Sequence, residues 1–253
     1  MHQEPSDPLS RIHSVADGID GLRAIRAAEE PLEDALRRVA DTAVRMTPDA
    51  DAVTVTVFDD ESAAAGRTAA CTDPAVLELD ESQYSSHRGP CLHAAQAREP
   101  LRMRIDPTDQ RWPEFASAAT TVGVRASLSV PLLIGVDVHH DQELAGSLNI
   151  YSRSADAFDP FDEELVRLYS VAAGQAISNG RRWQQSRNTL TQLEQALVSR
   201  STIDQAKGAL RAIHGYTAEE AFAALVEQSQ HRNVKLHIVA SEFLDSLTTP
   251  QGR

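Results

Sequence analysis

The stretch Ala52-Val-Thr-Val-Thr-Val-Phe58 decides the fold class of this chain. Its valines alternate with threonines, which is the pattern of a β-strand with one face in a core and the other face polar. Residues 127–134 and 144–151 are rich in aliphatic residues and predict two more strands. Residues 68–71 are the candidate hairpin partner of the first strand. Because helical patterns surround these strands, we expect an α+β fold.

Helical periodicity flanks the predicted strands. Apolar residues recur at helical spacing over residues 31–46, which predicts one helix, and residues 73–125 indicate loops and short helices. Asp159-Pro160 opens a longer helix, and no strong helix breaker follows before Gly215. We therefore expect one helix to continue from about residue 162 to residue 213. Its inward stripe is expected to contain Leu165, Leu168, Tyr169, Ala172, Ala176 and Ile177.

The two ends of the chain differ in character. Residues 1–20 are polar, contain two prolines and predict a flexible arm. After Gly215, the capping box Thr217-Ala-Glu-Glu220 opens a helix, and a last helix is expected from about residue 234 to residue 247. With the end of the long helix, these two form a minimal three-helix bundle. Its core is expected to include Ala206, Ala221 and Phe222.

Charge is distributed unevenly along the 253 residues. The net charge is −13, which argues against a protein that coats nucleic acid nonspecifically. Residues 1–187 account for −12 of this charge and residues 188–253 for −1. Both lysines of the chain, Lys207 and Lys235, lie in the near-neutral C-terminal part. This asymmetry indicates two modules with different partners.

Composition and sequence patterns also indicate the cellular compartment of the protein. Hydrophobic residues make up 42% and charged residues 24% of the chain, as in ordinary globular proteins. The most apolar uncharged run, residues 126–136, is too short to span a bilayer, and the first residues do not resemble a secretory signal. Two cysteines, Cys71 and Cys91, do not make a disulfide framework. We expect a cytoplasmic protein without a membrane partner.

Motifs for catalysis and metal binding are missing from the sequence. It contains no phosphate-binding Gly-Lys-Ser/Thr loop, no His-Glu-x-x-His and no Gly-x-Ser-x-Gly, so we expect no catalytic residues. His87, Cys91 and His93 lack the paired short spacings of a structural zinc site, even with Cys71 added. His139-His140-Asp141 is interpreted as the tip of a hairpin loop over residues 135–143. We therefore expect no metal.

Residues 22–180 resemble a GAF domain. The resemblance is carried by Gly89-Pro-Cys91-Leu, Arg111-Trp-Pro-Glu-Phe115-Ala, Gly123-Val-Arg-Ala-Ser-Leu-Ser-Val-Pro-Leu132, Gly146-Ser-Leu-Asn-Ile-Tyr-Ser152 and Ala157-Phe-Asp. It implies a small antiparallel sheet flanked by helices over residues 21–182. Many GAF domains hold a small molecule over one sheet face, whereas others only dimerise or relay a signal. The Asn-Lys-Phe-Asp-Glu signature of cyclic-nucleotide-binding members is absent, and the ligand stays unknown.

Residues 188–248 resemble an ANTAR domain, whose limits we place at 190–248. The matching segments are Ala196-Leu-Val-Ser199-Arg200, Ile203-Asp-Gln205-Ala206-Lys207-Gly208, Glu220-Ala221-Phe222 and Asn233-Val-Lys235-Leu236. The resemblance implies a three-helix RNA-binding module of bacterial antiterminators, which recognises paired RNA hairpins so that the terminator stem cannot form. Two polar positions depart from the usual family pattern, at Leu210-Arg211 and at Lys235-Leu-His237.

Seven side chains are the candidate RNA-binding donors, because RNA recognition needs groups that reach phosphates and base edges. They are Gln205, Lys207, Arg211, Ser229, Arg232, Asn233 and Lys235. Structural alternatives stay open. Lys207 and Arg211 form an i, i+4 pair that also suits a solvated helix face, and Asn233 also suits the N-cap of the last helix.

The two modules are joined by a predicted linking helix over residues 183–199. Leu190, Leu193 and Leu197 follow coiled-coil spacing there, which fits either a dimer seam or ordinary core packing. Together these features predict a homodimeric, signal-responsive regulator that binds hairpins in nascent RNA and prevents transcription termination. The alternatives are a ligand-controlled or dimerisation-controlled scaffold without nucleic-acid binding, and a GAF-fold enzyme using its cysteines.

Overall fold

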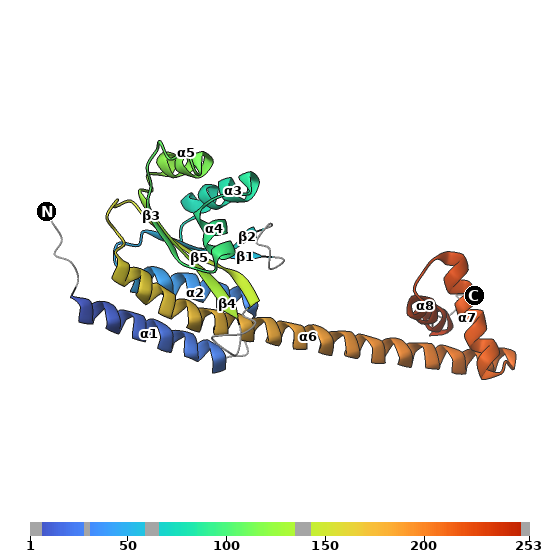
Figure 1. Cartoon of the computed structure of the whole chain (residues 1–253). Coiled ribbons are helices and arrows are strands. Elements are labelled where there is room, and N and C mark those ends of the chain that lie inside the picture. Colours follow the sequence, from blue (N-terminus) through green and yellow to red (C-terminus); the bar gives the residue numbers. More distant parts are fainter. Residues whose placement is uncertain (1–6, 28–30, 59–65, 135–142, 249–253) are drawn as a thin grey trace. The chain divides into compact units, whose positions relative to one another are not determined.

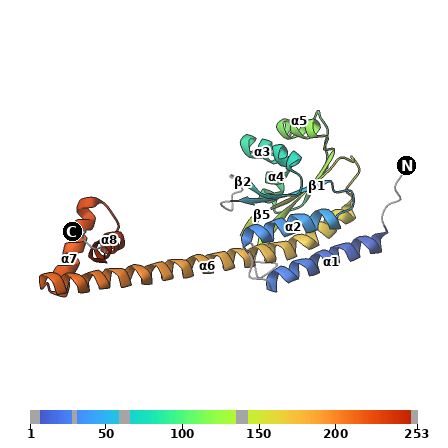
Figure 2. The same ribbon diagram turned by 180° about the vertical axis from the view of Figure 1, so that it is seen from behind.

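The computed structural model describes residues 7–27, 31–58, 66–134 and 143–248 (Figures 1 and 2). The chain divides into two compact units, with the boundary between Gln184 and Gln185. We call them the sensor unit and the C-terminal unit and describe each by itself. One long helix, α6 (Pro160–His214), contributes residues to both.

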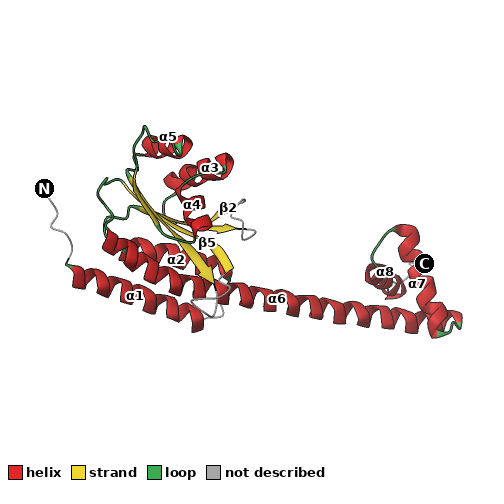
Figure 3. Cartoon of the chain, viewed as in Figure 1, coloured by secondary structure: helices red, strands yellow, loops and turns green. Residues whose placement is uncertain are grey.

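A five-stranded antiparallel sheet forms the centre of the sensor unit (Figure 3). Its strand order is β2-β1-β5-β4-β3. The strands are β1 (Ala52–Phe58), β2 (Gly66–Cys71), β3 (Leu101–Arg104), β4 (Ala126–Ile134) and β5 (Glu143–Ser152). The predicted strands and the pairing of β2 with β1 are confirmed. Strand β3 was not predicted, because four residues are too few for a clear alternation. The expected hairpin loop lies outside the described residues except for Glu143.

Helices cover both faces of this sheet. Figures 1 and 2 show α3 (Leu77–Ser86), α4 (Pro90–Ala97) and α5 (Pro113–Val122) on one face, with α2 (Leu32–Met46) and the first part of α6 on the other. Val53, Val55 and Val57 of β1 enter the core with α2 and α6. The threonines between them are buried too, so the expected half-exposed strand is wrong. Coverage of both sheet faces by helices explains the difference.

The expected flexible arm over residues 1–20 is wrong from Pro8 onward, where helix α1 (Pro8–Ala27) begins. Residues 1–6 lie outside the described part. The inward stripe of α1 is Arg11, Val15, Gly18 and Leu22, at helical spacing. Because half of this stripe is not apolar, hydrophobic periodicity could not reveal the helix.

The predicted long helix is confirmed as α6, which has 55 residues. Tyr169, Ala176 and Ile177 are buried as predicted, whereas Leu168 is 57% exposed, so its place in the inward stripe is wrong. A Cβ added to Gly174 would lie 2.3 Å from the carbonyl oxygen of Leu133. This glycine therefore lets α6 approach β4 more closely than any other residue allows.

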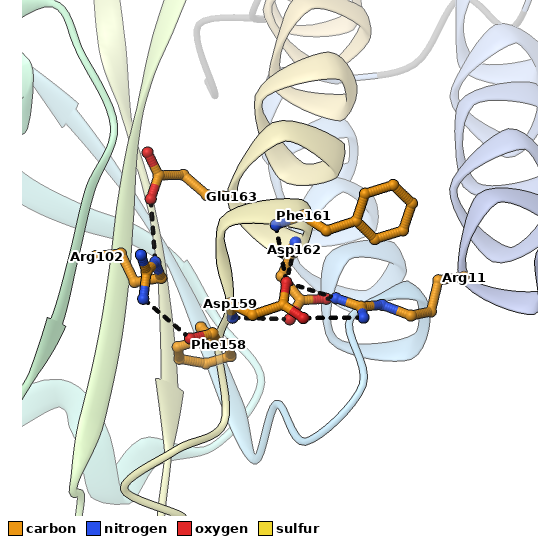
Figure 4. Close-up of polar contacts among 7 residues, drawn as sticks. All are labelled: Arg11, Arg102, Phe158, Asp159, Phe161, Asp162 and Glu163. Atoms are coloured by element: carbon orange, nitrogen blue, oxygen red, sulfur yellow. Dashed lines mark hydrogen bonds and ion pairs between the residues drawn. The ribbon is translucent and has the colours of Figure 1, made fainter. Parts of the chain in front are cut away.

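Two arginines hold the first turn of α6 (Figure 4). Asp159 caps the helix by accepting from the backbone N–H groups of Phe161 and Asp162, at 2.8 Å each. Arg11 from α1 pairs with Asp159 and Asp162, and its hydrogen bonds lower the pKa of Asp159 to about 2. Arg102 from β3 binds the Glu163 carboxylate at 3.1 Å. The start of the long helix is thus tied to both α1 and the sheet edge.

The C-terminal unit is a three-helix bundle, as predicted. It contains the end of α6, α7 (Ala218–Arg232) and α8 (Leu236–Thr248). Gly215, at φ 71°, follows the last residue of α6, and the predicted capping box at Thr217 is present. The buried core consists of Ala206, Leu210, Ala221, Leu225, Val239 and Ala240. Phe222 is 44% exposed, so its expected place in this core is wrong. Position 222 follows the buried Ala221 by one residue, or about 100° around the helix.

Candidate functional site

The seven candidate RNA-binding residues fall into two groups. Gln205, Lys207 and Arg211 lie in the last turns of α6, whereas Ser229, Arg232, Asn233 and Lys235 surround the turn between α7 and α8. The two groups differ in what their side chains already do within the bundle.

The α6 group presents charge on one helix face. Arg200, Lys207, Arg211 and His214 recur at intervals of seven, four and three residues, so they share one side of the helix, and we call them the basic stripe. The Lys207 Nζ atom lies 3.0 Å from Oδ1 of Asp204 and 5.9 Å from the centre of the Phe222 ring. Arg211 is exposed, one turn further along.

Gln205 is also exposed, and its amide donates to the Ser201 hydroxyl at 3.4 Å. That weak contact within one helix turn leaves its amide oxygen at the surface, so this side chain can still meet a partner.

The turn group is largely used by the fold. The Ser229 hydroxyl donates to the carbonyl of Val234 at 2.6 Å, which fastens the turn. Asn233 ends α7 in a left-handed conformation at φ 50°, so it caps the C-terminus of α7 and is not the N-cap of the last helix. Arg232 pairs with Glu242 of α8 at 2.7 Å. Lys235 is exposed. In this group Lys235 is therefore the stronger candidate for contact with RNA.

The leucines of the predicted seam stand outside the bundle core. Leu190, Leu193 and Leu197 are 55%, 57% and 68% exposed. Ordinary core packing within one chain therefore does not account for their spacing. Three exposed leucines on one helix face leave apolar surface that a second helix would cover.

The second candidate site is a buried polar network in the sensor unit, which sequence reasoning missed. It consists of Thr54, Thr56, Thr68, Asp80, Tyr84, Cys91, Asn149 and Tyr151. These side chains come from β1, β2 and β5 and from helices α3 and α4 that cover this sheet face. The threonines at alternate positions of β1 were the available signal, because they gather polar groups on the face opposite the valines.

The hydrogen bonds of this network converge on Asp80. Its carboxylate accepts from the hydroxyls of Thr68 and Tyr151, at 2.6 Å each. Since the Thr68 proton points to Asp80, the Tyr84 hydroxyl at 3.0 Å must donate to Thr68. Thr56 then donates to Tyr84 at 2.8 Å. A chain of hydroxyl groups thus orients every donor toward one buried carboxyl.

Burial shifts the titration of this network. It raises the pKa of Asp80 despite the hydrogen bonds, because the charged form loses its hydration. Burial, with the charge of Asp80, raises the pKa of the Cys91 thiol to about 12. Cys91 is therefore a neutral thiol that contacts the Thr56 hydroxyl at 3.6 Å, and not a reactive nucleophile.

Other buried side chains of the sensor unit have hydrogen-bonding atoms without a partner. Among the described residues, Gln83 Nε2, Ser127 Oγ and Ser129 Oγ are buried without a partner. Within the same part of the chain, no three His, Cys, Asp or Glu side chains gather as metal ligands would. His139-His140-Asp141 lies outside it. Across the described helices, none is long and apolar enough to cross a bilayer.

Comparisons with known proteins agree with both units. The sequence model of the GAF domain family matches residues 31–177, and that of the ANTAR domain family matches residues 191–244. No curated protein sequence matches the chain.

Among solved structures, the chain is similar to the GAF domain of a phosphoenolpyruvate-protein phosphotransferase from Coxiella burnetii. The identity is 17% and the TM-score 0.50, over 68% of this chain and 96% of that one. It is also similar to the phytochrome photosensory core module of Stigmatella aurantiaca, with 16% identity and a TM-score of 0.51. A bacteriophytochrome from R. palustris matches with 14% identity and a TM-score of 0.52. These two matches cover 88% and 84% of this chain and 45% of each phytochrome. At such identities the likeness shows the fold alone.

Proposed function

The chain belongs to the GAF domain family and also contains an ANTAR domain, and from this premise we propose that it prevents transcription termination by binding RNA hairpins. The two domain types make it a signal-controlled regulator. In this proposal the C-terminal unit binds the RNA and the sensor unit receives the signal. It also places the protein in the cytoplasm, where nascent transcripts of bacteria are made.

The basic stripe is the structural observation that carries this proposal. Arg200, Lys207 and Arg211 place three cations on one face of α6 in a unit of nearly neutral charge. Each cation that neutralises a phosphate contributes to affinity through release of counterions. Three such contacts per chain support modest affinity for one hairpin.

A homodimer would join two such faces. The exposed Leu190, Leu193 and Leu197 supply the apolar seam, and linking two binding units makes the second hairpin contact intramolecular. This arrangement suits a pair of neighbouring hairpins, because neither unit alone needs to bind tightly. We therefore propose a homodimer whose partner is paired hairpins in a nascent transcript.

The input to the sensor unit is proposed to be a small molecule or a contact with another protein. Gln83, Ser127 and Ser129, which lie in the same unit as the buried polar network, have buried donors without a partner and could bind a polar ligand. The proposal assigns no catalytic step, because burial raises the pKa of the Cys91 thiol and keeps it neutral.

The Lys207→Ala variant tests the proposed function. RNA is first selected with the wild-type chain from a pool of paired hairpins with randomised loops, and its affinity is then measured at two salt concentrations. We expect Lys207→Ala to bind several-fold more weakly, with the slope of log affinity against log salt reduced by about 1. The free energy of unfolding should fall by no more than about 1 kcal/mol, because the partly exposed Lys207 pairs with Asp204 within one helix turn.

Arg167→Ala is the matched control for this experiment. Arg167 also lies on α6 and also pairs with an acid three residues away, Glu164, but it belongs to the sensor unit. Its loss should leave RNA affinity unchanged. If the wild-type chain retains no RNA from the pool, the scaffold alternative replaces the proposed function.

A further inference from the structure

Phe222 lies at the surface of the C-terminal unit, although its sequence pattern predicted a place in the core. It is 44% exposed, although its neighbours Ala221 and Leu225 on α7 are 0% and 2% exposed. A large aromatic ring at the surface of a small bundle gives up burial that would stabilise the fold. Single exposed apolar residues are common, so exposure alone carries no argument. The charged neighbours of the ring provide one.

A cation is held over this ring. Lys207 Nζ lies 5.9 Å from the ring centre, and Asp204 Oδ1 lies 3.0 Å from the same ammonium group. Lys207 belongs to the basic stripe, so the ring adjoins the face where phosphates are expected. His214, also in the basic stripe, stacks its ring on that of Tyr216 at 5.3 Å and 27°, and Tyr216 is 38% exposed.

Aromatic rings beside cations fit single-stranded RNA. Unpaired bases of hairpin loops stack on aromatic side chains, while neighbouring cations contact the phosphates. A purely apolar partner would leave Lys207 desolvated without a counter-charge beyond Asp204. We propose that Phe222 is a stacking platform for an unpaired loop base and that Lys207 contacts the adjoining phosphate. The inference rests on the proposed function and names the part of the RNA that this site reads.

The test uses the full chain and RNA selected by the wild-type protein from the randomised hairpin pool. Phe222→Leu keeps an apolar side chain but removes the ring, and we expect about tenfold weaker binding with an unchanged salt slope, because the ring carries no charge. Phe222→Tyr keeps the ring and should bind within about twofold of wild type. Lys207→Ala differs from both by lowering the salt slope.

Phe161→Leu is the matched control. Phe161 is 36% exposed and also lies beneath a cation, since the Arg11 guanidinium is 4.8 Å from its ring centre, but it belongs to the sensor unit. Its replacement should leave RNA binding unchanged. Wild-type affinity for Phe222→Leu would overturn the stacking role while leaving the proposed function intact. A wild-type chain that retains no RNA would overturn both.

Two further measurements test whether Phe222 acts in dimerisation or folding instead of in RNA binding. Sedimentation of Phe222→Leu should match wild type, and a shift toward monomer would reassign the ring to a contact between copies of the chain. Should Phe222→Leu unfold, Phe222→Trp decides, because a stacked base quenches indole fluorescence. We expect RNA to quench this variant more strongly than wild type, which reports only Trp112 and Trp183. Equal quenching would overturn the proposal.

Discussion

Gly174 and Gly208 lie in the same helix, yet the two units surround them differently. A Cβ on Gly174 would collide with the Leu133 carbonyl at 2.3 Å, whereas a Cβ on Gly208 would meet nothing within 4 Å. In the sensor unit the backbone of α6 packs directly on that of β4, and a polar network is buried between the sheet and the helices α3 and α4. The C-terminal unit has a core of six buried residues, three of them alanines, and leaves cations and rings at its surface.

This contrast teaches what each part of the helix is used for. In the sensor unit one side of the helix is buried against the sheet and its neighbours, so the residues on that side are constrained by shape. In the C-terminal unit most of the helix surface is left for partners, so its residues are constrained by what they bind. The predictions below test that division, beginning with the largest expected effect.

Gly174→Ala should destabilise the sensor unit by about 3 kcal/mol. The added methyl meets backbone rather than a flexible side chain, so α6 must move away from β4 and the core between them must repack. Urea unfolding of the full chain, followed by a probe in each unit, measures the effect. A loss below about 1 kcal/mol would show that α6 can shift at little cost and would weaken the contrast.

Asp80→Asn should reduce the pH dependence of the stability of the sensor unit. Because burial raises the folded-state pKa of Asp80 above its unfolded value, the folded chain holds this proton more tightly. Its contribution is present at pH values below the unfolded pKa, and it is lost as the pH rises through the folded pKa.

The measurement is the free energy of unfolding of the sensor unit at several pH values from 4 to 8, for Asp80→Asn and wild type. We expect the decline with rising pH to be steeper in wild type. Parallel curves of unfolding free energy against pH would mean that the pKa of Asp80 is the same in the folded and unfolded states. Asp80 would then not be the source of the pH dependence.

Leu193→Gln should weaken self-association about tenfold, as loss of one apolar side chain from a helix seam would. Leu168→Gln is its counterpart in the sensor unit, since both leucines are 57% exposed. Sedimentation velocity over a range of concentrations compares them. If only Leu193→Gln acts, the seam is confined to the C-terminal unit, and equal effects would extend it along α6. No effect from either change would argue against a leucine seam.

Gly208→Ala should have the smallest effect and the opposite sign from Gly174→Ala. Alanine is a better helix former than glycine, and open space surrounds the position, so we expect a gain of up to about 1 kcal/mol in the C-terminal unit. Thermal unfolding measures it. A loss of stability would show that another part of the chain packs against Gly208. The surroundings of Gly174 and Gly208 would then differ less than the comparison states.

The sequence predicted most elements because local patterns were strong where they occurred. Alternation in β1, the uninterrupted helical character of α6 and the capping box at Thr217 depend on neighbours in the chain. Where the pattern was broken, prediction failed. Helix α1 escaped notice because Arg11 and Gly18 occupy half of its inward stripe. Strand β3 has only four residues.

Local pattern also determined which residue types line the candidate sites, but not how they are used. Lys207, Arg211 and Gln205 were found from spacing and family resemblance, and so was Ser229, whose hydroxyl serves the turn instead. Only the tertiary structure placed Phe222 beside Lys207 and brought Thr68 and Tyr151 to Asp80. These contacts join residues distant in the chain, and their geometry depends on how helices and strands pack, which no periodicity records.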